Sequence, residues 1–303
     1  MPKFVLLGVL ALGFLGLSAP SSHTQSPEPN AYGWNNTPVT VTISGTPPIH
    51  YRVNGGPWIS GDTVVLSSEG IHTVEYYDAT ESPDTPNRAV IRIDLTPPTI
   101  LVRVPEEDKK YILHEKVFVD WFAYDRISGL ELTEASARPG EPLDTGSPGY
   151  QTFWVFARDR AGNSARLEVD YQVIFKLSTV FPSGFWLDRL LPPEEQVKVG
   201  LFPVLARYKV GEPILFGFLL RDANDVVFAQ ARPNVLVTEV RFTEEGERHT
   251  IWDWVPIPFD QEKGFYFLAY PTEKRKPGIY DLWLGFGDGQ SLRIRVEIQG
   301  GAS

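Results

Sequence analysis

The chain of 303 residues contains no cysteine and only one methionine. The absence of cysteine excludes disulfide bonds, thiolate metal sites and a cysteine nucleophile. Each domain must therefore be stabilised by its apolar core alone. The chain is 42% hydrophobic and 13% aromatic, which is enough apolar side chain for such cores and excludes a disordered protein.

Positive charge is also scarce. The 28 Lys and Arg residues face 38 Asp and Glu residues, a formal net charge of −10, and the longest basic run is Lys-Arg-Lys at 274–276. Nucleic-acid binding requires a basic stripe or patch, and a lipid-surface anchor requires a polybasic segment. We therefore expect no nucleic-acid partner, and the acidity mainly favours solubility.

Catalytic signatures are missing as well. His114-Glu115 is not followed by a second histidine four residues after the first, because position 118 is phenylalanine, so the zinc-protease pattern fails. No G-x-S-x-G nucleophile elbow occurs, and no glycine-rich phosphate loop precedes a helix. We expect a non-catalytic protein without a cofactor; an unrecognised hydrolase with its site between domains is the remaining enzymatic hypothesis.

The N-terminus has the layout of a secretory signal peptide. Lys3 precedes an unbroken apolar run at 4–17, and the small residues Ala19 and Ser21 then favour cleavage after Ser21. The run is shorter than the ~20 residues that a membrane span needs. We expect a mature chain without a membrane span that is secreted, periplasmic or on the cell surface.

The rest of the chain alternates between apolar and polar residues with a period of two. Residues 39–43 (Val-Thr-Val-Thr-Ile), 72–76 and 90–94 follow this pattern, and Asn54-Gly55-Gly56 has the composition of a tight turn. No segment sustains the spacing of an amphipathic helix. These observations predict an all-β fold of antiparallel strands.

Three tandem β-sandwich domains of the immunoglobulin (Ig) type are expected after the signal peptide. The prolines at 97 and 98 mark a boundary, and the pattern at 70–74 recurs 79 residues later at 149–153. From about residue 176 the chain becomes richer in large aromatic residues. The predicted ranges are a signal peptide at 1–21, a flexible leader at 22–31, Ig-like domains at 32–97 and 98–175, and a larger C-terminal sandwich at 176–303.

The first region resembles a bacterial extracellular Ig-like repeat family. Its motifs, in chain order, are Y-G-W at 32–34, V-T-V-T at 39–42, Y-R-V-N-G-G-P-W at 51–58, G-I-H-T-V-E-Y at 70–76 and D-L-T-P-P at 94–98. The second region is similar to the same class through D-R-I-S-G-L at 125–130 and D-R-A-G-N at 159–163. In the first region a longer loop at 78–87 replaces the latter turn.

The third region is similar to accessory sandwich domains that carry a V-G-E-P-x-x-F motif, here at 210–216, and a G-x-Y-x-L strand, here at 278–282. Modules of these families are usually non-catalytic spacers, stalks, adhesion units or substrate-binding accessories. The resemblance therefore implies a spacer or adhesion-type binding module whose partner is a protein or glycan of the cell envelope. A sandwich by itself fixes no function.

Calcium is the one ion that the sequence makes worth considering. Asp125, Asp159 and Asn163 lie in predicted loops that could converge at one end of the second sandwich, and calcium prefers such oxygen ligands. The alternative is turn chemistry, since Asp and Asn side chains bind nearby backbone amides. The turn interpretation is the favoured one.

Trp252 and Trp254 are the candidate ligand-binding residues. Residues two apart on a strand share a face, so both rings could form one platform for a sugar. The favoured alternative is that the rings pack in a core or between domains. The alternative function of the chain is therefore a carbohydrate-binding accessory protein, which requires both rings to be exposed.

Overall fold

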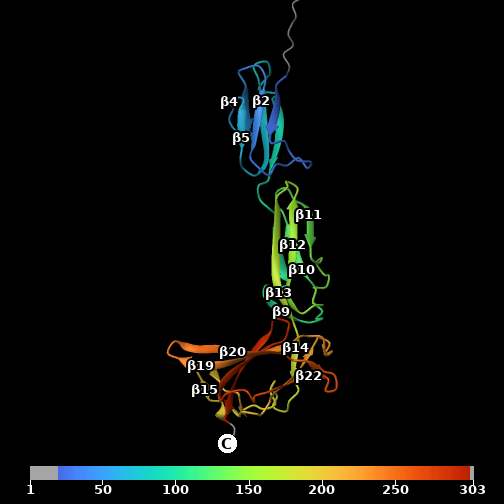
Figure 1. Ribbon diagram of the computed structural model, residues 1–303. Helices are drawn as coiled ribbons and strands as arrows, with labels where there is room; N and C mark the ends of the chain where they lie inside the picture. Colours follow the sequence, from blue (N-terminus) through green and yellow to red (C-terminus); the bar gives the residue numbers. More distant parts are fainter. Residues whose placement is uncertain (1–19, 301–303) are drawn as a thin grey trace, which may run out of the picture. The chain divides into compact units, whose positions relative to one another are not determined.

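The computed structural model describes residues 20–300, and strands dominate it (Figure 1). The only helix among these residues is the short 3-10 turn Pro193–Glu195. The all-β, Ig-like fold predicted from the alternating pattern is confirmed. Residues 1–19, and with them most of the predicted signal peptide, lie outside the described residues. In the described part, no helix is long and apolar enough to cross a membrane.

The first pair of sheets is built from the first seven strands. One sheet has the order β1-β2-β5, and the other has the order β4-β3-β6-β7. The bounds are β1 Ser22–Ser26, β2 Val39–Ser44, β3 His50–Val53, β4 Ile59–Ser60, β5 Thr63–Leu66, β6 Gly70–Tyr77 and β7 Asn87–Ile93. Val39, Val41 and Ile43 of β2 point into the core, where they meet Ile91 and Ile93 of β7. Their alternation with threonine is why the strand was predictable.

The predicted flexible leader at 22–31 is not what the structure contains. Ser22–Ser26 forms β1, which pairs antiparallel with β2 from Ser22↔Ser44 to Ser26↔Thr40. Ser21 is buried, and its amide and hydroxyl donate to the Glu81 carboxylate at 3.0 and 2.5 Å. β1 is polar on both faces, so it lacks the apolar alternation that reveals a strand. A cut after Ser21 would remove contacts of the first sandwich.

The second pair of sheets contains β8 and β10 on one side and the order β11-β12-β13-β9 on the other. The bounds are β8 Thr99–Val104, β9 Lys109–Ile112, β10 Asp120–Tyr124, β11 Leu130–Ala135, β12 Gly149–Asp159 and β13 Ser164–Ile174. β9 runs parallel to β13, while Trp121, Phe153 and Tyr171 are buried in the interior. The buried indole of Trp121 donates to the carbonyl of Ala137 at 2.8 Å.

The third pair of sheets has the orders β14-β18-β22-β21 and β17-β24-β23-β19-β20, with a small β15-β16 ribbon beside them. The bounds are β14 Lys176–Thr179, β15 Lys198–Val199, β16 Phe202–Pro203, β17 Ala206–Lys209, β18 Ile214–Arg221, β19 Asn234–Thr243, β20 Gly246–Pro256, β21 Phe259–Asp260, β22 Phe265–Tyr270, β23 Gly278–Gly285 and β24 Ser291–Gln299. Aromatic residues fill its core, with Phe218 stacked on Tyr266 and edge-on to Phe286.

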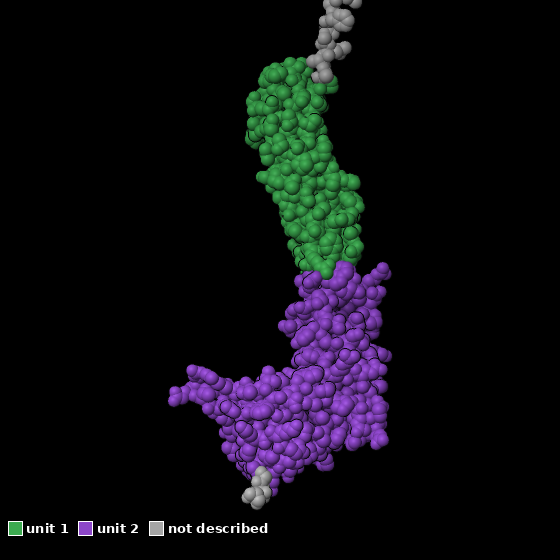
Figure 2. All heavy atoms as spheres, in the orientation of Figure 1, with its two compact units in different colours: residues 1–100, 123–134, 156–166 green, residues 101–122, 135–155, 167–303 purple. Residues whose placement is uncertain are grey.

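The described residues form two compact units, coloured green and purple in Figure 2. The first comprises residues 20–100, 123–134 and 156–166, and the second comprises 101–122, 135–155 and 167–300. The three sheet pairs span residues 22–93, 99–174 and 176–299, and the division into units runs through the second pair. One end of the second sheet pair therefore packs with the first sheet pair, and the other end packs with the third.

Candidate functional site

The first unit brings the three calcium candidates together. Carboxylate oxygens of Asp94, Asp125 and Asp159 lie within 4.8 Å of one another, and Asp94 and Asp159 are fully buried. The side-chain amide of Asn163 (Nδ2) donates to Asp159 Oδ2 and to the carbonyl of Asp94, both at 2.9 Å. Asp94 was not predicted as part of this group. It directly follows β7, the closing strand of the first sandwich, and the only sequence signal was its place in the D-L-T-P-P motif.

Backbone amides already occupy these carboxylates. Asp125 Oδ1 accepts from Ile127 and Gly129, and Asp159 Oδ1 accepts from Gly162 and Asn163, all at 2.7–3.1 Å. These bonds are the turn chemistry described as the favoured alternative.

Asp94 links the two sandwiches at this point. Its carboxylate accepts from the amides of Thr96 at 3.1 Å and Ser128 at 3.0 Å. Burial raises the pKa of Asp94, and the nearby charge of Asp125 raises it further. The oxygen-rich group has the donor chemistry that calcium prefers, but the bonds to backbone amides are those of the favoured turn interpretation, and calcium binding stays the untested alternative.

A second junction lies inside the second unit, between the second and third sheet pairs. The fully buried Asp288 accepts a bond from the Phe175 amide through Oδ2 at 2.7 Å, and its carbonyl accepts from Gln172 Nε2 at 2.8 Å. The carbonyl of Leu113 accepts from the Ala223 amide at 2.9 Å. Buried polar groups of both sheet pairs are therefore satisfied by each other.

At the same junction, His114 Nδ1 lies 2.9 Å from Asp222 Oδ2. This hydrogen bond is the largest cause that lowers the pKa of Asp222, from its ordinary 3.8 to about 2, with help from the amides of Val226 and Asn224. Because the folded-state pKa is the lower one, the ionised carboxylate stabilises the fold above about pH 4. That contribution is lost as the pH falls towards 2.

Replacing His114 with alanine should therefore raise the pKa of Asp222 and move acid unfolding to higher pH. A carboxyl-carbon NMR titration of Asp222 measures the effect. Asp78 in the first sandwich is the internal control. The amide of Thr46 and the hydroxyl and amide of Thr80 lower the pKa of Asp78, and His114 takes no part in these bonds. An unchanged Asp222 titration in the variant would contradict this assignment.

Trp252 and Trp254 are both exposed, at 40% and 61%. They do not share a face. The pairing of β19 with β20 passes from Val237↔Asp253 to Thr238↔Ile251, so Trp252 is the extra residue of a β-bulge. Trp254 lies opposite Leu236, whereas the Trp252 indole donates to Glu239 at 2.9 Å, on the other face of β19.

The period-two argument for a single aromatic platform therefore fails at the bulge. The guanidinium of Arg275 also lies over the Trp252 ring, 5.2 Å from its centroid. Trp254 is exposed on the opposite face. The exposure of both rings disagrees with the packed arrangement favoured from the sequence. Sugar binding stays the alternative hypothesis, and it would have to use each ring separately.

The third sandwich contains a charged cluster that the sequence analysis missed, formed by Glu247, Asp281, Arg293 and Arg295. Arg295 and Asp281 are buried, and Arg295 Nε donates to Asp281 Oδ1 at 2.8 Å. Glu247 accepts from Arg295 and Arg293 at 2.8 and 3.0 Å, which holds the pKa of Glu247 well below its usual range.

His249 completes a Glu247–His249–Asp281 group whose ligand atoms lie within 4.8 Å of one another. The two guanidinium groups already neutralise both carboxylates, so this chemistry favours an ion-pair network over a metal site. The sequence signal was the pair Arg293 and Arg295, which alternate with apolar residues on β24.

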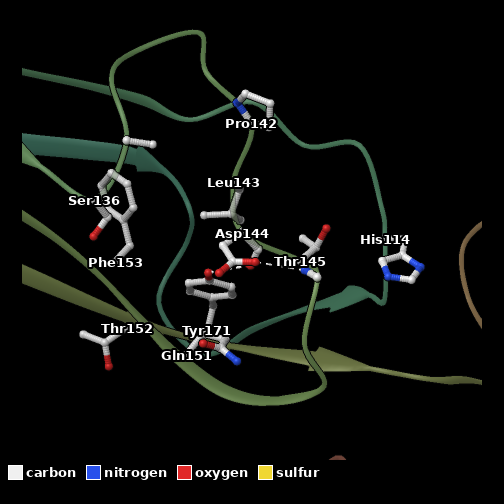
Figure 3. Close-up of a pocket in the computed structure, with 12 residues that line it drawn as sticks. His114, Ser136, Pro142, Leu143, Asp144, Thr145, Gln151, Thr152, Phe153 and Tyr171 are labelled. Carbon is white, nitrogen blue, oxygen red and sulfur yellow. Dashed lines mark hydrogen bonds between the residues drawn. The ribbon is translucent and has the colours of Figure 1, made fainter. Parts of the chain in front are cut away.

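The second unit also contains a cavity of about 520 Å³ between β12 and the loop that follows β11 (Figure 3). Leu143, Phe153 and Tyr171 are buried at its floor, and Asp144 and Gln151 are among its polar lining residues. The Tyr171 hydroxyl donates to the carbonyl of Asp144 at 2.7 Å, and burial raises the pKa of Tyr171 to about 12. This cavity was not predictable from the sequence, because the loop that lines it has no periodic pattern.

No protein-family model and no curated protein matches the chain. Similar solved structures include Sidekick-1 immunoglobulin domains 1–5, at 14% identity and a TM-score of 0.31, with 93% of this chain and 59% of that chain covered. A tetra-tandem repeat from the extending region of a large adhesion protein has 13% identity and a TM-score of 0.33, with 94% and 75% covered. The Escherichia coli adhesin FdeC has 13% identity and a TM-score of 0.25, with 94% and 99% covered.

The chain thus spans less than two thirds of the Sidekick-1 structure. Similarity at these identities concerns the fold, and the activity and partners of those proteins do not transfer to this chain.

Proposed function

We propose that the chain is an exported, non-catalytic protein of Ig-like sandwiches. It works as a spacer and adhesion-type binding module at the cell surface or in the periplasm. Its partner is a protein or glycan of the envelope.

The observation that carries the spacer role is the direct bonding at the two junctions. At the first junction, Asp94 accepts the Ser128 amide, and Asn163 donates to the carbonyl of Asp94. At the second, Asp288 accepts the Phe175 amide. A freely hinged linker would leave such groups to water. Here they are buried, so bending at either junction would break bonds that water cannot immediately replace.

The exposure of Trp252 and Trp254 keeps carbohydrate binding as the second candidate function. Exposed aromatic side chains are common at binding surfaces. The bulge makes a shared sugar platform unavailable, and Arg275 covers one side of the Trp252 ring. We therefore rank a protein partner above a glycan.

The test is a binding assay of the purified protein against defined polysaccharides and against its own envelope extract. We expect a defined envelope protein to be retained, with retention unchanged by Trp252→Ala and Trp254→Ala. Binding of a defined polysaccharide that is lost in Trp254→Ala would favour the carbohydrate-binding function instead. Turnover of a substrate by the protein would contradict the non-catalytic role.

A further inference from the structure

The two neighbouring strands β11 and β12 differ in length. β11 has six residues and ends at Ala135, whereas β12 has eleven residues and begins at Gly149. The last backbone bond along their shared edge runs from the Ser136 amide to the Trp154 carbonyl at 3.0 Å, after which the chain leaves the sheet. The first five residues of β12, 149–153, therefore extend beyond the end of their neighbour.

Residues 151–153 of this overhang line the cavity. In a strand, alternate residues direct their amide and carbonyl to the same side. The carbonyl of Trp154 points towards β11, so the backbone groups of Thr152 and Tyr150 point to the same side. Among residues 20–300, no strand continues the sheet there. Such a row of backbone donors and acceptors is a template for an added strand.

The opposite wall of the cavity is the segment 141–143, which pairs with residues 117–119 through an isolated bridge and leaves the gap open. The Leu143 amide donates to the carbonyl of Val117 at 2.8 Å, and the Val119 amide donates to Glu141, so this wall does not pair with β12. Figure 3 shows the loop arching away from β12 between Ser136 and Pro142. A cavity of about 520 Å³ thus lies directly beside an open strand edge.

The lining gives the gap one distinct charge. Asp144 is its only carboxylate and is exposed, and Oδ1 of Asp144 accepts just the amide of Gly146 at 3.0 Å. The one imidazole of the lining, His114, is bound to Asp222. The buried side chains of Leu143 and Phe153 provide an apolar floor.

We propose that this gap accepts an extended segment of a partner polypeptide, which adds as a strand beside residues 149–153. The backbone edge selects an extended peptide, the apolar floor takes a side chain of that peptide, and Asp144 pairs with a lysine or arginine on it. This proposal names the partner for the binding role above and rests on that role. We call residues 149–153 with this cavity the strand-acceptor gap.

The experiment is a selection of random decapeptides displayed on phage against the purified protein, followed by affinity measurement with the best peptide in synthetic form. We expect the selected peptides to be rich in β-branched residues and to carry a lysine or arginine. Binding should slow hydrogen exchange at the Thr152 and Tyr150 amides. Asp144→Asn should weaken binding about threefold or more and reduce its salt dependence.

Two matched changes separate backbone pairing from other contacts. Thr152→Pro removes the amide that faces the gap and should weaken binding at least tenfold, whereas Thr152→Ala should stay within about twofold. If Thr152→Pro fails to fold, N-methylation of alternate peptide amides replaces it, and the same tenfold loss is expected.

The proposal would be overturned if the selection yields no binding peptide. It would also be overturned if the selected peptides bind outside the gap and keep their affinity after N-methylation. Because the selection uses peptides alone, its failure leaves the envelope-binding result standing. A failed envelope assay likewise leaves a peptide-binding gap detectable.

Discussion

Replacement of Asp281 with alanine is expected to lower the free energy of unfolding by about 3–5 kcal/mol, because it breaks a buried ion pair from one side. Asp281 is fully buried and accepts bonds from Arg295 Nε at 2.8 Å and Arg293 Nε at 2.9 Å. Without it, the buried guanidinium of Arg295 keeps only Glu247 as a carboxylate partner. Urea unfolding followed by tryptophan fluorescence measures the loss.

Glu245→Ala is the matched control for this variant. Glu245 pairs with Arg248 in the hairpin formed by β19 and β20, but both side chains are largely exposed, at 78% and 67%. Exposed pairs contribute about 0–1 kcal/mol. Equal effects of the two substitutions would contradict a structural role for the buried cluster.

Replacement of Asp288 with alanine is the second substitution with a large expected effect. It removes the acceptor of the Phe175 amide and leaves that buried donor unsatisfied, which costs about 1–3 kcal/mol. The loss falls at the junction of the second and third sandwiches, so we expect these parts to unfold less cooperatively. Calorimetry should show a broader or split transition.

Asp225→Asn is the control at this junction. Asp225 pairs with Lys176 at the surface, and its positive φ of 62° is one that asparagine tolerates. We expect the calorimetric transition of this variant to keep its wild-type shape. A single unchanged transition in Asp288→Ala would show that the bond to Phe175 does not couple the two parts.

The fold was predictable wherever one face of a strand is buried. β2 shows this plainly, because Val39, Val41 and Ile43 are buried while Thr42 is exposed. β1 was missed because Ser22–Ser26 is held by backbone bonds to β2 and has no apolar face to reveal it. A polar edge strand has the composition of a loop, so a single sequence cannot distinguish the two.

The candidate sites were predictable only in part, for a related reason. Asp125, Asp159 and Asn163 lie close together because their turns are at one end of the second sandwich. Their fourth partner, Asp94, comes from another sandwich, and only the structure brings it close. The bulge at Trp252 places this side chain on the face opposite to Trp254. No residue type in β20 indicates a bulge, so the sequence could not predict it.

The central claim is that buried hydrogen bonds fix the junctions between sandwiches, and a distance distribution across one junction tests it most directly. The chain has no cysteine, so spin labels can be attached at cysteines that replace exposed Lys116 and Lys274 in the second unit. Double electron–electron resonance between the two spin labels should give one narrow distance distribution. The Asp288→Ala substitution should broaden it. A broad distribution in the otherwise unmodified protein would show a freely hinged junction and contradict the spacer role.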